Sequence, residues 1–146
     1  MNYRVILCLV LPIFIMVFGL TVNFYEFLSG SPATIKNLIV TFVYMSIWVT
    51  CLVIALNAES LALMRFYSII WLLTLGIAGL TAYINYTDTT VNFGWAIPFA
   101  VLFLAQWIGL NFLIDSYLVL SLIISIISLI MFITITSIIR RWKRVF

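Results

Sequence analysis

Apolar residues fill most of the chain in long runs, and polar residues fall mainly between these runs or at regular spacing inside them. Five runs are long enough to cross a hydrocarbon core of about 30 Å, which takes about 20 helical residues. They cover residues 5–25, 38–57, 66–86, 94–114 and 117–139. The pattern predicts an all-α, polytopic integral membrane bundle of five transmembrane helices. We expect residues 1–146 to form a single membrane-embedded domain without a soluble domain.

The last third of the chain leaves an alternative open. A single helix over residues 94–139 would be about 69 Å long, more than twice the thickness of the hydrocarbon core, so this part must fold back. Asn111, Asp115 and Ser116 are turn-forming residues that can end a fourth span. In the alternative topology, residues 94–110 form a re-entrant segment that enters near Pro98 and leaves on the same side, which gives four full spans.

The basic residues bear on this choice, because Lys and Arg concentrate on the cytoplasmic side of membrane proteins. Five spans place five of the seven basic residues on that side and leave Arg4 and Arg65 outside, whereas four spans leave only Lys36 outside. Charge therefore slightly favours four spans, and segment length favours five. We expect five spans in the plasma (cytoplasmic, or cell inner) membrane, with the N-terminus outside and the C-terminus in the cytoplasm.

Composition excludes a water-soluble globule. Hydrophobic residues make up 66% of the chain and charged residues 8%, too few to cover a folded surface in water. The chain has no His, and its two cysteines, Cys8 and Cys51, lie in separate apolar runs without metal-ligand spacing. We therefore expect no metal, no cofactor and no catalytic residues, and the prediction is that the protein is not an enzyme.

Polar side chains inside spans normally face other helices and therefore predict the interior of the bundle. Asp115 is the strongest candidate, because an intramembrane carboxylate is the usual minimum for proton-coupled transport. The candidates for a polar interior or pathway are Asp115, Gln106, Asn111, Asn23, Ser121 and Ser125.

Small residues in the third run predict close packing between helices. These residues are Gly76, Ala78, Gly79 and Ala82. The basic run near the C-terminus predicts a topology anchor at the cytoplasmic headgroups. The anchor consists of Arg140, Arg141, Lys143 and Arg144. Trp95 and Trp107 lie toward span ends, where aromatic side chains are typical of the interface belt.

These features favour a non-catalytic protein that acts through helix contacts with other membrane components, as an accessory, regulatory or immunity-type subunit. The alternative is a small oligomeric transporter or channel for an ion or small solute, with Asp115 in the pathway. The expected partners are the lipid bilayer and another membrane protein or a second copy of the chain. Nucleic acid is not expected to bind.

Overall fold

The computed structural model describes residues 3–87 and 94–145, apart from the side chains of Arg4 and of residues 143–145. Apart from short links between the elements, the described chain is helical, with 3₁₀ helices on both sides of a short fourth helix. The elements in order are α1 (Tyr3–Ser29), α2 (Ile35–Asn57), α3 (Leu61–Thr87), η1 (Gly94–Ala96), α4 (Ile97–Leu104), η2 (Ala105–Phe112) and α5 (Tyr117–Val145). Five helical segments are long and apolar enough to cross a membrane, so the predicted all-α membrane bundle is confirmed.

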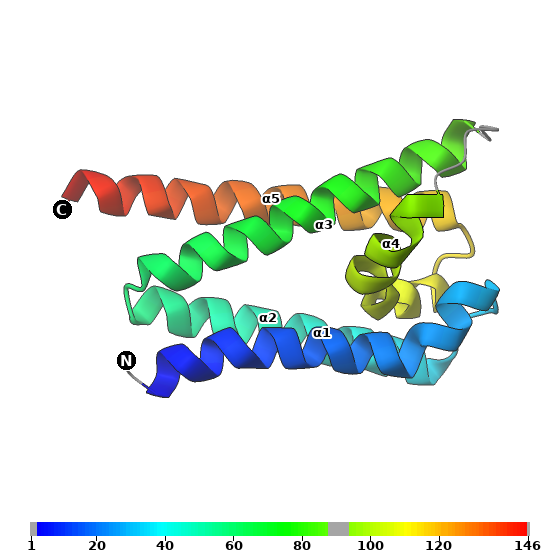
Figure 1. Cartoon of the computed structure of the whole chain (residues 1–146), viewed down its shortest axis with the longest axis horizontal. Coiled ribbons are helices and arrows are strands. Elements are labelled where there is room, and N and C mark those ends of the chain that lie inside the picture. The colour runs from blue at the N-terminus through cyan, green and yellow to red at the C-terminus, as the bar shows by residue number, and fades with distance from the viewer. Residues whose placement is uncertain (1–2, 88–93, 146) are drawn as a thin grey trace.

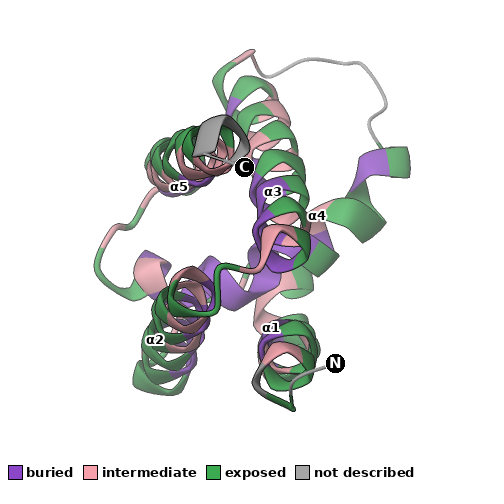
Figure 2. Ribbon diagram, turned by 90° about the vertical axis from the view of Figure 1, so that its left-hand side faces the viewer, coloured by how far each residue is buried: buried purple, intermediate pink, exposed green. Residues whose placement is uncertain are grey.

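The long helices form two layers. α1 and α2 lie side by side in one layer, and α3 packs along α5 in the other (Figure 1). A three-residue link, Ala58–Ser60, joins α2 to α3 and thus connects the layers. Figure 2, which looks along the helices, shows buried residues facing the space between the layers and exposed residues facing outward. Because this outward surface is largely apolar, its natural solvent is lipid.

The fourth segment, here residues 94–112, begins and ends at the same end of the bundle (Figure 1). α3 reaches this end at Thr87, and α5 starts from it at Tyr117. α4 has 8 residues and is therefore about 12 Å long, too short to cross a bilayer by itself. Four helices thus run the length of the bundle, and the fourth segment, although it has the length and composition of a candidate span, begins and ends at one end of it.

This arrangement also places the N-terminal end of α1 and the C-terminal end of α5 together, at the end opposite the fourth segment (Figure 1). Five successive crossings would place these two ends of the helical path at opposite ends of the bundle. They lie together because η2 follows α4 with a 3₁₀ backbone and returns toward the end from which α4 started.

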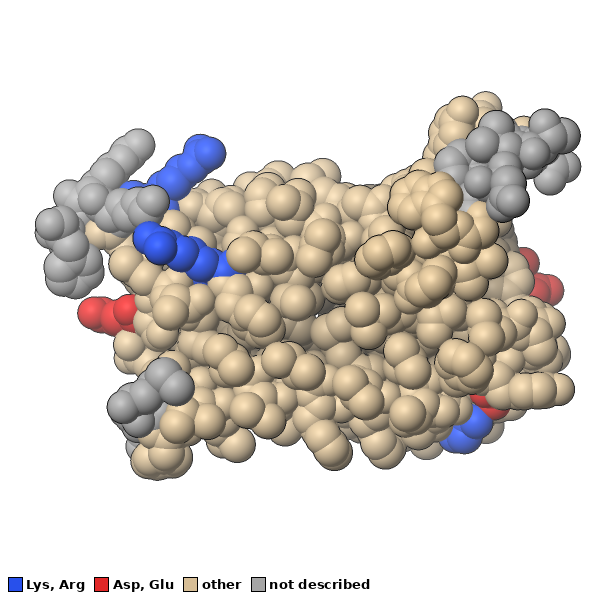
Figure 3. Space-filling model, viewed as in Figure 1, with Lys and Arg blue, Asp and Glu red and all other residues tan. Residues whose placement is uncertain are grey.

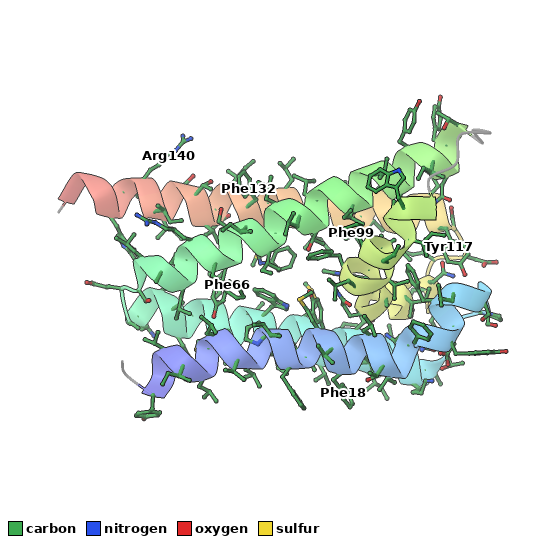
Figure 4. All side chains as sticks on the ribbon, viewed as in Figure 1. Phe18, Phe66, Phe99, Tyr117, Phe132 and Arg140 are labelled. Atoms are coloured by element: carbon green, nitrogen blue, oxygen red, sulfur yellow. The ribbon has the colours of Figure 1, made fainter. Side chains whose placement is uncertain are left out.

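Aromatic side chains fill the space between the layers. Five of them pack edge to face, with ring centroids 5.3–6.3 Å apart, and each is at most 1% exposed. This aromatic cluster consists of Tyr44, Trp48, Tyr67, Trp71 and Trp107. Trp107 is thus buried between the layers, not in an interface belt as its position near a span end had suggested, whereas Trp95 is 62% exposed. Figure 4 shows side chains from both layers filling this space.

Candidate functional site

The backbone where α4 passes into η2 is held by side chains from the other layer. The Asn23 amide on α1 donates a 2.9 Å hydrogen bond to the carbonyl of Ala105, and the Thr41 hydroxyl on α2 donates a 2.7 Å bond to the carbonyl of Gln106. Both donor side chains are buried. Because lipid offers no hydrogen bonds, irregular backbone at membrane depth is tolerated only where protein groups satisfy it. These two contacts therefore help to hold the fourth segment where it changes from α to 3₁₀ backbone.

A second set of contacts orients Asn23. The Asn37 amide donates to the Asn23 side-chain oxygen at 2.9 Å. The Asn37 oxygen in turn accepts from the Thr34 backbone N–H and from the Thr34 hydroxyl, both at 2.7 Å. Thr34 immediately precedes α2, so the same asparagine that fixes Asn23 also holds the first turn of that helix. Asn23, Asn37, Thr41 and Gln106 together form what we call the amide cluster.

Two glycines let the fourth segment approach the first layer closely. A Cβ on Gly109 would overlap the backbone carbonyl of Asn37, and a Cβ on Gly19 would lie 2.9 Å from the Cβ of Gln106. Any larger residue at Gly109 would push η2 away from α2. The close approach is what brings the Gln106 carbonyl within reach of Thr41.

The amide cluster and the nearby Asn111 are uncharged and retain spare acceptor capacity. The Gln106 amide nitrogen donates to the Phe103 carbonyl at 2.7 Å. Within the described part of the chain, the Gln106 side-chain oxygen and the Asn111 side-chain oxygen are buried without a hydrogen-bond partner. Amides and aliphatic hydroxyls do not titrate near neutral pH, so the cluster itself cannot relay a proton by changing its charge. It can hold backbone, accept hydrogen bonds or contribute neutral oxygen ligands.

The predicted interior residues fall into two groups. Asn23 and Gln106 belong to the amide cluster, and Asn111 is buried in η2 close by in sequence. Asp115, in contrast, is exposed in the link between η2 and α5, at the end of the bundle rather than inside it. Figure 3 shows the charged side chains gathered at the two ends of the molecule, with an uncharged belt between them. The structure thus gives Asp115 the position of a turn residue.

The serines of α5 lie outside the amide cluster. Ser121 and Ser125 donate hydrogen bonds of 2.7 and 2.8 Å to the carbonyls of Tyr117 and Ser121, within their own helix. Ser121 is buried and Ser125 is half-buried. The candidate residues therefore do not form one continuous line through the described structure.

The small residues of α3 point in two directions. Ala78 and Ala82 are buried against the rest of the bundle, as the packing prediction requires. Gly76 and Gly79 are exposed, and the space that a Cβ would occupy at each is open, so they make no close helix contact within the described chain. Of the predicted anchor, Arg140 and Arg141 are exposed near the end of α5, while the side chains of Lys143 and Arg144 lie outside the described part.

Asn37 and Thr41 were not singled out by sequence reasoning, although a signal for them exists. Asn37, Thr41, Tyr44 and Trp48 follow one another at steps of four, three and four residues, the spacing of a single helix face. All four are buried, and this face of α2 points toward the fourth segment and α3.

Comparisons of the chain with models of protein families, with curated proteins and with solved structures find no match.

Proposed function

We propose that this chain is a non-catalytic multi-pass membrane protein that acts through helix contacts with other membrane components, as an accessory, regulatory or immunity-type subunit. The observation that supports this most is the use made of the interior polar groups. The hydrogen bonds of these groups hold the protein itself. Asn23 and Thr41 donate to backbone carbonyls of the fourth segment, and Asn37 donates to the Asn23 side chain. Their arrangement is that of a scaffold, which presents fixed outer surfaces to the membrane.

A groove on the outer face of the first layer is the surface that best suits such a contact. It has a volume of about 370 Å³ and lies between Leu11 of α1 and one face of α2. Ser46 and Thr50 lie in it, each donating a 2.8 Å hydrogen bond to a carbonyl of its own helix. Small hydroxyl-bearing residues on a lipid-facing surface favour close approach of another helix.

We further propose that the protein lies in the plasma membrane with both the N-terminal end of α1 and the C-terminal end of α5 on the cytoplasmic side. Arg65, Arg140 and Arg141 lie at this end of the bundle, whereas Lys36 lies at the opposite end and pairs with Glu26 at 2.6 Å. This distribution follows the preference of basic residues for the cytoplasmic side.

The proposal can be tested with a photoreactive amino acid introduced into the full chain in its native membrane. Val43→p-benzoylphenylalanine places the probe in the groove, and the same change at Ile126 places it on the outward face of α5. We expect a discrete cross-linked product at position 43 and none at position 126, its mass distinguishing a second copy from another protein. A chain that gives no product at position 43, and that purifies in mild detergent as a monomer without a companion, would contradict the proposal.

A second function, a small oligomeric transporter or channel, is favoured by one observation. The spare oxygens of Gln106 and Asn111 are neutral ligands of the kind that can coordinate a cation in a membrane interior. Ion or solute flux into liposomes that contain the protein tests this function, with Asp115→Asn and Gln106→Leu as variants. Flux that Gln106→Leu abolishes would favour transport over the contact role. The absence of flux under any gradient would rule out the transport function.

A further inference from the structure

A cavity of about 220 Å³ lies near the end of the bundle where the fourth segment enters, among α1, α3, α4 and α5. It is separate from the groove on the first layer, with which it shares no residue. Its apolar lining residues are Phe27, near the end of α1, and Leu104, Leu120 and Ile124, which lie farther in. At about 30 Å³ for each water-sized group, the cavity has room for about seven such groups.

The polar residues of the cavity lie on α3 and α5. Thr81 and Ser121 donate their hydroxyl hydrogens to carbonyls of their own helices, at 2.9 and 2.7 Å, so their oxygen lone pairs remain available as acceptors. Ser121 is only 4% exposed. Asn85, near the end of α3, adds an exposed amide that can both donate and accept, and Tyr117 adds a phenol at the start of α5.

The rim of the cavity carries two polar residues, and the hydroxyls of Thr81 and Ser121 lie farther in, beside apolar residues. Asn85 and Tyr117 lie next to the end of the bundle, whereas Ile124 follows Tyr117 by seven helical residues, about 10 Å farther in. A molecule with a polar head at the rim and an apolar chain directed toward Leu104 and Ile124 would fit this cavity, with the deeper hydroxyls as further hydrogen-bond acceptors. The eight described residues that line the cavity are uncharged, so none of them offers a counter-charge to an ionised head group.

We propose that this cavity binds a neutral amphiphile, with its short apolar chain against Leu104, Leu120 and Ile124 and its hydroxyl or carbonyl group hydrogen-bonded near Asn85 and Ser121. The same chemistry is offered by a free medium-chain alcohol and by a neutral glycerolipid of the bilayer. The proposed contact role does not depend on this site, because the groove lies on the outer face of the other layer.

The test uses the full chain in phosphatidylcholine nanodiscs and two photoreactive probes. One probe is octanol with a diazirine on its chain, added from solution, and the other is a monoacylglycerol with a diazirine on its acyl chain, incorporated into the bilayer. Labelled residues are mapped by mass spectrometry. We expect labelling to concentrate on Leu104, Leu120 and Ile124 with one probe or both, and the more efficient probe identifies the source of the ligand.

The deciding variant is Ser121→Leu, which fills the cavity and removes an acceptor. Its matched control is Ser137→Leu, the same change at an exposed position of the same helix. Ser121→Leu should abolish most of the labelling of Leu104 and Ile124, and Ser137→Leu should leave it unchanged. Labelling that Ser121→Leu does not reduce, or that is spread evenly over outward residues such as Ile126, would overturn the proposal.

Asn85→Ala keeps the proposal testable if Ser121→Leu does not fold. Asn85 is exposed, so its truncation leaves the core of the bundle intact. Loss of one hydrogen bond to the head group should reduce labelling by about twofold to tenfold. Undiminished labelling in Asn85→Ala would show that the head group does not bind at this rim, which is the result that contradicts the site.

Discussion

At the scale of single residues, neutral amides and one hydroxyl determine where the chain can leave regular helix geometry inside the bundle. Asn23 and Thr41 each satisfy one carbonyl of the fourth segment, and Asn37 holds Asn23 in position. A buried hydrogen bond contributes about 0.5–1.5 kcal/mol to protein stability. A few such bonds, from side chains on two other helices, therefore help to hold the turn of the fourth segment.

Thr41→Val should reduce the free energy of unfolding by about 0.5–1.5 kcal/mol, because it keeps the side-chain shape but removes the buried hydrogen bond to the Gln106 carbonyl. The measurement is unfolding of the purified protein in mixed micelles with increasing SDS. Thr50→Val is the matched control, since the Thr50 hydroxyl is exposed and bonds only within its own helix. Equal effects of the two substitutions would show that the Thr41 contact does not hold the fourth segment.

Gly109→Ala should destabilise the protein by about 1–3 kcal/mol, because the added methyl group overlaps the Asn37 carbonyl and forces η2 away from α2. Gly79→Ala is the control: its Cβ enters open space, and it should be neutral or slightly stabilising because alanine favours a helix. The thermal unfolding midpoints of both variants test this difference. A Gly109→Ala protein as stable as wild type would contradict the close approach of η2 and α2.

The sequence identifies part of the amide cluster and not the rest. Asn23 and Gln106 are interior polar residues by their position within apolar runs. Asn37 lies one residue before the predicted start of the second span at residue 38, so a prediction from span boundaries assigns it to the loop. Asp115 shows the converse problem, because a carboxylate in a continuous apolar region can be an intramembrane group or a turn residue, and only the fold decides.

At the scale of elements, the four long helices follow from hydrophobic length, and the fourth segment does not. Residues 94–112 have the length and composition of a span. Their direction depends on the change from α to 3₁₀ backbone at Ala105 and on contacts with α1 and α2, which no local pattern contains. The count of apolar segments is therefore predictable here, while the path of the fourth segment is a tertiary property.

The aromatic cluster gives a test of this element. Trp107 on η2 packs against Tyr44 at 5.5 Å and Trp71 at 6.3 Å, between ring centroids, and so joins the fourth segment to both layers. Trp107→Phe should speed hydrogen–deuterium exchange across residues 97–112 by about tenfold, since loss of well-packed aromatic contact costs at least about 1 kcal/mol. Trp95→Phe, at an exposed position, should leave exchange unchanged. Similar exchange in both variants would contradict a role for Trp107 in holding the segment.

At the scale of the whole molecule, the bundle has an uncharged middle and charged ends (Figure 3). The basic residues Arg65, Arg140 and Arg141 lie at one end of the four full-length helices. The N-terminal end of α1 and the C-terminal end of α5 lie at this same end. The inserted segment occupies the other end and separates the two layers there. Both the charge distribution and the helix order support the orientation that we propose.

The central claim, that the fourth segment enters and leaves on one side of the membrane, is tested most directly by single cysteines at Asn85 and Asp115, which flank it. Both changes are made in a Cys8→Ala, Cys51→Ala background, with Glu59→Cys as a marker of the opposite end. The measurement is labelling by a membrane-impermeant maleimide in vesicles of known orientation. We predict that positions 85 and 115 are labelled from the same side and position 59 from the other. Labelling of positions 85 and 115 from opposite sides would mean that the segment crosses the membrane, and would contradict the account.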